Sequence, residues 1–104
     1  MRTMWLFAMF DLPVDTKAAR RHYVKFRNYL LSEGFSMLQY SVYARYCASE
    51  ERTKAFRRRI QLELPPEGEV RLLSVTDRQF GKMETYYGKK REPTEKKPEQ
   101  ILLF

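Results

Sequence analysis

The chain has 104 residues, which suits one domain with a modest core. Hydrophobic residues make up 43% of it, and 20 Lys and Arg against 13 Asp and Glu give a formal net charge of +7. This composition excludes a disordered chain, and no apolar run is long enough to span a membrane. The basic excess favours a polyanionic partner: nucleic acid first, then an acidic membrane surface. The remaining alternative is solubilising charge that binds nothing specific.

The first apolar segment predicts a central strand. Met4 to Phe10 is continuously apolar, as in a strand buried on both faces, and it stops at Asp11-Leu12-Pro13. The same segment lacks a small-residue cleavage site, so we expect no signal peptide. Cys47 is the only cysteine, which excludes an internal disulfide framework and suits a reducing cytoplasm.

A helix is predicted next, capped by Asp15 or Thr16 and running to about Glu33, before Gly34. Its buried stripe consists of residues at steps of four, three and four: Ala19, Tyr23, Phe26 and Leu30.

The rest of the chain predicts a hairpin, a helix, a strand and a tail. Residues 35–47 are predicted to form a hairpin that pairs 37–39 with 42–47, or one long bent strand. The helix begins after Ser49 and ends at Pro65-Pro66. A strand follows from Glu69 to Thr76. The secondary structure of residues 80–87 is ambiguous. Residues 89–99 are predicted to be an extended linker, and the apolar residues 101–104 are predicted to add a strand to a sheet edge.

The order strand, helix, strand, strand, helix, strand predicts an α+β fold of the ferredoxin-like βαββαβ type. In it, two helices cover one face of an antiparallel sheet. We therefore predict a ferredoxin-like domain over residues 1–80, followed by a linker and an added strand over residues 81–104.

Residue counts exclude several kinds of active site. His22 is the only histidine, so with one cysteine a zinc site within the chain is excluded, and nothing supports a Ser-His-Asp arrangement. Neither common phosphate-binding glycine loop is present.

Asp11 is the most informative carboxylate, because it lies at the carboxyl end of the predicted central strand. It is a candidate ligand for a hard cation such as Mg²⁺; the alternative is that it only organises the Asp-Leu-Pro turn. One carboxylate is too few for a metal site, so phosphodiester hydrolysis at Asp11 requires a symmetric dimer that supplies two copies. Candidate phosphate contacts are the basic residues after the first and fourth strands: Lys17, Arg20, Arg21 and Arg78.

These motifs resemble the CRISPR-associated protein two family, the smaller partner in spacer acquisition during prokaryotic antiviral defence. The resemblance covers roughly residues 4–80 and rests on three blocks: Phe10-Asp11-Leu12-Pro13, Gly34-Phe35 with Leu38-Gln39-Tyr40-Ser41-Val42-Tyr43, and Val70 to Thr76.

The resemblance implies a homodimer with metal-dependent nuclease activity on RNA or DNA, in which Asp11 from both protomers holds Mg²⁺. It also implies that the dimer bridges integrase subunits along double-stranded DNA, a role in which cleavage can be dispensable. The C-terminal strand, Ile101-Leu102-Leu103-Phe104, would pair with the partner protomer. The alternatives are a related ferredoxin-like toxin ribonuclease and a plain RNA-binding module.

Overall fold

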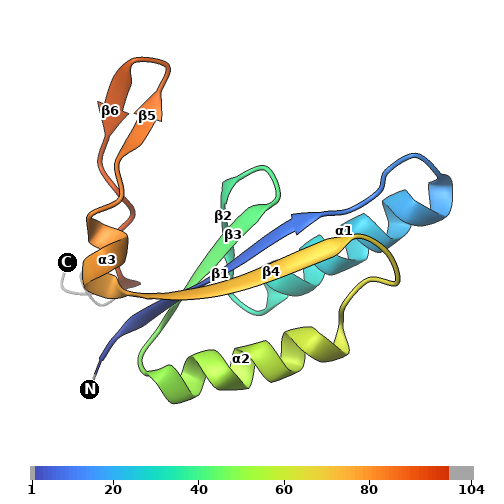
Figure 1. Ribbon diagram of the computed structural model, residues 1–104, viewed down its shortest axis with the longest axis horizontal. Helices are drawn as coiled ribbons and strands as arrows, with labels where there is room; N and C mark the ends of the chain where they lie inside the picture. Colours follow the sequence, from blue (N-terminus) through green and yellow to red (C-terminus); the bar gives the residue numbers. More distant parts are fainter. Residues whose placement is uncertain (1, 99–104) are drawn as a thin grey trace.

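The structure is a computed structural model that describes residues 2–98. Its elements follow the predicted order, with three additions after the fourth strand (Figure 1). Their bounds are β1 Met4–Asp11, α1 Lys17–Ser32, β2 Ser36–Gln39, β3 Val42–Cys47, α2 Glu50–Leu62, β4 Glu69–Thr76, α3 Asp77–Gly81, β5 Thr85–Tyr87 and β6 Lys90–Glu92.

The main sheet has four strands in the order β2-β3-β1-β4, with every pair antiparallel. β1 is central, as its apolar sequence predicts, and it pairs along its whole length with β4, from Met4 opposite Thr76 to Asp11 opposite Glu69. β2 and β3 are joined by a short turn at Tyr40 and Ser41. Ser41 takes φ 64°, and its carbonyl accepts a hydrogen bond from the Phe10 amide.

Both long helices begin at the predicted caps. The side chains of Thr16 and Ser49 accept hydrogen bonds from the amides of Ala19 and Arg52 at 3.0 and 3.3 Å. The helices cover one face of the sheet, where the core contains side chains from α1, α2 and alternate residues of β1: Phe26, Leu30, Phe56, Ile60, Met4, Leu6, Ala8 and Phe10. The ferredoxin-like α+β prediction is confirmed for this part of the chain.

The opposite face of the sheet has a smaller apolar cluster that the sequence did not predict. Phe80 of α3 is buried and stacks on the Trp5 ring at 4.0 Å, and the Trp5 Nε1 donates a hydrogen bond to Asp77 at 2.7 Å. The sequence left residues 80–87 ambiguous. The first two of them are the last residues of the short helix α3, which covers the start of β1.

The tail prediction is partly wrong. Residues 89–99 were predicted to be an extended linker, but Lys90–Glu92 forms β6, which pairs with β5 in a separate antiparallel hairpin. Gly88 turns between the strands with φ 63°, so the chain doubles back at the point where charge and proline content suggested extension. The predicted C-terminal strand, 101–104, lies outside the described residues.

No helix in the described range combines the length and the apolar character that crossing a membrane requires.

Candidate active site on the open face of the sheet

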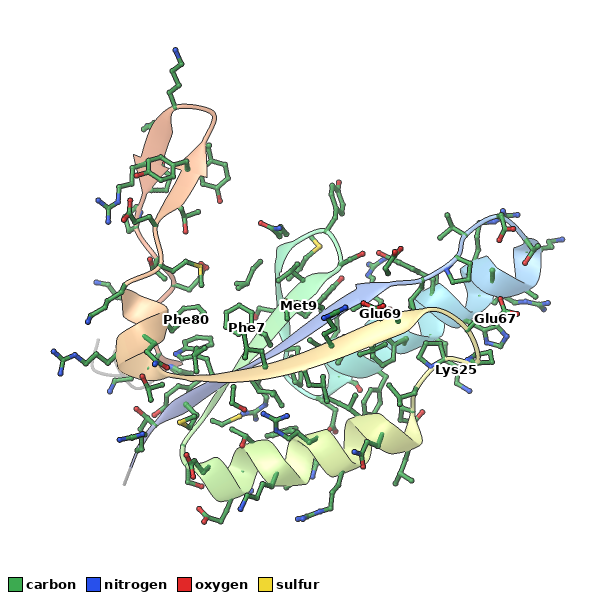
Figure 2. The ribbon with its side chains drawn as sticks, viewed as in Figure 1. Phe7, Met9, Lys25, Glu67, Glu69 and Phe80 are labelled. Carbon is green, nitrogen blue, oxygen red and sulfur yellow. The ribbon has the colours of Figure 1, made fainter. Side chains whose placement is uncertain are left out.

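Asp11 is the last residue of β1, and its side chain is exposed. Side chains alternate along a strand, and the even-numbered residues of β1 pack against the helices. The odd-numbered residues Trp5, Phe7, Met9 and Asp11 therefore face the other side, which we call the open face. In Figure 2, Phe7 and Met9 lie on the side of the sheet opposite α2.

Glu69 is a second carboxylate beside Asp11, and the sequence pattern did not single it out. It is the first residue of β4 and lies directly opposite Asp11 in the antiparallel register. Directly opposite residues hold their Cβ atoms roughly 4.5–5.5 Å apart, so both carboxylates project from the same corner of the open face. Only the β1–β4 register brings them together, since 58 positions separate them along the chain (69 − 11).

The side chain of Arg71 adds a positive charge beside these two carboxylates. Arg71, two residues after Glu69 on the same face, donates a hydrogen bond from Nε to the Glu69 carboxylate at 2.7 Å. This hydrogen bond, together with the charge of Glu69, raises the pKa of Arg71 above its usual value. Because both side chains are exposed, the pair orients Glu69 but adds little stability.

The backbone of Asp11 is held by a close contact with Gly68. Gly68 takes φ +92°, and a Cβ built on it would lie 2.7 Å from the carbonyl oxygen of Asp11. Only glycine fits this approach without strain. The sequence Gly68-Glu69 therefore fixes the end of β1 against the start of β4.

The Asp11 carboxylate itself is available for a ligand. Between residues 2 and 98 it forms no hydrogen bond or ion pair, so it does not organise the Asp-Leu-Pro turn through its own backbone. The described residues contain no group of three or more His, Cys, Asp or Glu that could hold a metal. Carboxylates such as Asp11 and Glu69 are the kind of ligand that Mg²⁺ takes from a protein, one or two at a time, when water and phosphate supply the rest.

The open face is only half covered. Phe80 and Met83 pack over Trp5 and Phe7, near the start of β1. At the middle of β1, Leu73 pairs with Phe7 and remains 49% exposed, and Met9, two residues closer to Asp11, is half-buried. Apolar side chains at the centre of a sheet are normally covered, so the half that contains Asp11 has the character of an interface.

Three of the four predicted phosphate contacts lie together. Lys17, Arg20 and Arg21 line one exposed face of α1, which continues with Val24, Lys25 and Asn28. Arg20 also has a structural role, because its Nη1 donates a hydrogen bond to the carbonyl of Val14 at 3.0 Å. This basic face begins one loop after Asp11.

Arg78 is not part of that surface. It lies in α3 beside Arg2 and Gln79, where β4 ends next to the start of β1. The eight residues of β1 separate it from the Asp11 corner, a distance of roughly 25 Å at the usual rise per residue.

Comparison with known proteins places these features in a family. The family described as CRISPR associated protein Cas2 matches residues 4–83. A protein of Parvibaculum lavamentivorans named CRISPR-associated endoribonuclease Cas2 is 52% identical over 101 residues, which cover 97% of this chain and 100% of that protein. Proteins with the same name from Flavobacterium psychrophilum and Ligilactobacillus salivarius are 44% and 39% identical, over 99% and 97% of this chain and 90% and 100% of their own lengths.

The match covers the main sheet, both long helices, α3 and the Asp11 corner, and the relatives extend it through most of the tail. The chain therefore belongs to the CRISPR associated protein Cas2 family.

Proposed function

We propose that this protein is a metal-dependent nuclease that acts as a homodimer, with Asp11 from both protomers at the reaction centre. The relatives named CRISPR-associated endoribonuclease Cas2 support nuclease activity. The observation that carries the proposal is the place of Asp11: an exposed carboxylate at the end of the central strand, on the uncovered half of the open face.

Two arguments favour the dimer: the number of metal ligands and the exposed apolar side chains of the open face. One protomer offers too few ligands, whereas two copies related by a twofold axis at the end of β1 would supply two copies of Asp11 and of Glu69. Pairing the open faces would also cover Met9 and Leu73. A divalent cation bound there would activate water and stabilise the charge that develops on the phosphodiester.

Within this site the protein's own groups have separate tasks. Asp11 would hold the cation, and the Glu69 carboxylate would add negative charge beside it. Arg71 donates to Glu69, and its positive charge would attract a phosphate group of the substrate. The rigid contact with Gly68 keeps the end of β1 in place while these groups act.

The dimer is tested with a matched pair of charge substitutions. Leu73→Lys places a cation on the open face, and Leu62→Lys does so on α2, where the native side chain is 84% exposed. We expect Leu73→Lys to shift the mass measured by light scattering to that of a monomer, and Leu62→Lys to leave the dimer intact. A dimer that survives Leu73→Lys would contradict pairing through the open face.

The nuclease is tested with Asp11→Asn, which keeps the size of the side chain and removes its charge. We expect Mg²⁺-dependent cleavage of single-stranded RNA or duplex DNA to be lost while the melting temperature is retained, since the carboxylate makes no bond within residues 2–98. Cleavage that persists in Asp11→Asn, or in EDTA, would point to a contaminating nuclease.

A second role is favoured by the basic face of α1. We propose that Lys17, Arg20 and Arg21 hold the backbone of double-stranded DNA while the dimer bridges integrase subunits during spacer acquisition in the cytoplasm. Their exposure on one helix face supports this role. Family membership favours it over the toxin ribonuclease and the plain RNA-binding module.

This second role predicts duplex binding that survives Asp11→Asn. Lys17→Gln and Arg21→Gln should each lower the slope of log affinity against log salt by about 1. Arg78→Gln is the matched control, because Arg78 lies beside the start of β1, far from α1. If it lowered the salt slope equally, phosphate contacts would not be confined to α1.

A further inference from the structure

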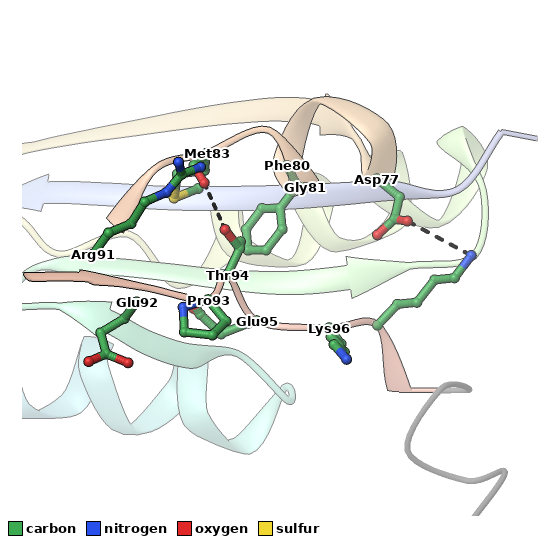
Figure 3. A pocket seen from close by; sticks show the side chains of 11 residues that line it. Asp77, Phe80, Gly81, Met83, Arg91, Glu92, Pro93, Thr94, Glu95 and Lys96 are labelled. Carbon is green, nitrogen blue, oxygen red and sulfur yellow. Dashed lines mark hydrogen bonds and ion pairs between the residues drawn. The ribbon is translucent and has the colours of Figure 1, made fainter. Parts of the chain in front are cut away.

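Asp11 lies at the end of β1 that α3 does not cover. At the start of the strand α3 packs on the open face, and a cavity of about 590 Å³ lies between α3 and residues 91–97, with the Asp77–Lys97 ion pair at one end of it (Figure 3). These contacts are too far along the strand to fix Asp11. Its position depends instead on the contacts that the backbone at the end of β1 makes with the neighbouring strands.

One of those contacts comes from the β2–β3 turn, at Ser41. The turn continues the pairing of β1 with β3, because the carbonyl of Ser41 accepts a hydrogen bond from the Phe10 amide at 3.0 Å. On the other side of the strand, the carbonyl of Asp11 lies against Gly68. The end of β1 is therefore held between Ser41 and Gly68.

Ser41 adopts a backbone conformation that is costly for a serine. Its φ is 64°, and between residues 2 and 98 it is the only residue other than glycine with a positive φ. Glycine takes this conformation without steric cost. Another residue keeps it only where the surrounding contacts determine it. We therefore expect the side chain of Ser41 to make a contact that glycine lacks.

That contact is with Tyr23 of α1. The hydroxyl groups of Ser41 and Tyr23 lie 3.3 Å apart, within hydrogen-bond distance. The Tyr23 ring also packs edge-on against the Phe10 ring, with 5.8 Å between the ring centroids. Tyr23 therefore contacts both the turn that holds the Phe10 amide and the residue that precedes Asp11.

We propose that Ser41 and Tyr23 are positioning residues for the nuclease site. Their hydroxyl contact fixes the β2–β3 turn, and the turn holds the end of β1 so that Asp11 keeps its place beside the cation. This inference rests on the proposed nuclease function and adds two residues that act through Asp11. Because they hold the strand rather than the substrate, their loss should slow the reaction without weakening substrate binding.

The first experiment compares Ser41→Gly with Ser41→Ala in the full chain. Both lack the hydroxyl, so we expect both to lower kcat for Mg²⁺-dependent cleavage by up to about 100-fold with KM unchanged, the loss that a misplacement of about 1 Å can cause. Glycine relieves the strain of the positive φ and alanine keeps it, so Ser41→Gly should unfold at the higher urea concentration. Ser41→Thr keeps the hydroxyl and should retain kcat, although its added methyl group increases the strain.

Tyr23→Phe removes the partner hydroxyl and keeps the ring against Phe10. It should lower kcat as much as Ser41→Ala does, and the double variant should be no slower than either, because both substitutions remove the same contact. The matched control is Tyr29→Phe, which removes a hydroxyl from the same helix six residues later (29 − 23). It should leave kcat unchanged.

A second measurement does not depend on catalysis. Amide hydrogen exchange, followed by NMR without added metal, reports the hydrogen bond that Phe10 donates to Ser41. We expect faster exchange at Phe10 in Ser41→Ala and in Tyr23→Phe, and wild-type exchange in Tyr29→Phe.

The outcomes separate this inference from the proposed function. Reduced kcat with faster Phe10 exchange in Ser41→Ala and Tyr23→Phe would support the positioning role. Wild-type kcat in these variants, or reduced kcat with unchanged exchange, would overturn it and leave the proposed nuclease intact. So would a kcat that follows the urea midpoint, with Ser41→Gly more active than Ser41→Ala, because the loss would then be one of stability. A wild-type protein that cleaves nothing in Mg²⁺ would overturn both.

Discussion

Gly68→Ala should destabilise the protein by straining the backbone that carries Asp11. The added methyl group would lie 2.7 Å from both the Asp11 carbonyl oxygen and a methyl carbon of Leu12, and 3.0 Å from the Leu12 Cα. A flexible side chain can move away from such a contact, but two of these atoms belong to the backbone of the segment that ends β1. The end of β1 must shift, or Gly68 must leave its φ of +92°.

The cost has two parts. A side chain at positive φ costs about 1–2 kcal/mol, and overpacking a close contact costs about 1–3 kcal/mol. The total, about 2–5 kcal/mol, is a large fraction of the stability of a small domain, which is typically about 5–15 kcal/mol.

Two other glycines separate these parts. Gly88 has φ +63°, and a Cβ added there would have no neighbouring atom within 4 Å. Gly88→Ala should therefore lose only the stability that a side chain at positive φ costs. Gly81→Ala also meets nothing within 4 Å, and its φ lies outside the positive range, so it should be neutral. The assay is urea unfolding followed by far-ultraviolet circular dichroism at one protomer concentration, because stability in a dimer depends on concentration. A loss for Gly68→Ala no larger than that for Gly88→Ala would refute the argument that the β1–β4 contact is tight.

Other substitutions test separate parts of the fold. Phe80→Ala removes the ring stacked on Trp5 and should cost about 3–5 kcal/mol, with a red shift of Trp5 fluorescence in native buffer; an unshifted spectrum would contradict the stack. Ser49→Ala removes the cap of α2 and should cost about 1 kcal/mol in urea unfolding, and no loss would mean that the cap is replaced. Burial raises the pKa of the Cys47 thiol, so ionisation favours the unfolded chain, and stability should fall as pH rises past about 8.5. The native thiol should react with a disulfide reagent far more slowly than in urea, and equal rates would contradict its burial.

Much of the fold was predictable because its signals are local. The apolar run of β1, the caps Thr16 and Ser49, and the stripe along α1 depend on a few neighbouring residues, and the structure confirms each of them. The second long helix was predicted to end at Pro65-Pro66, but α2 stops at Leu62. The hairpin at β5–β6 was missed because charged residues and prolines outweighed the turn signal of Gly88.

The sequence by itself determined the βαββαβ order, the position of Asp11 at the end of a buried strand and the basic character of α1, since periodicity, capping and charge are written in consecutive residues. Only the tertiary structure decided which groups meet. The β1–β4 register places Glu69 opposite Asp11 and moves Arg78 to the far end of the sheet, and α3 covers one half of the open face while leaving the other half exposed. The physical reason is that strand register and the packing of α3 depend on the simultaneous burial of side chains distant in sequence, which no local pattern contains.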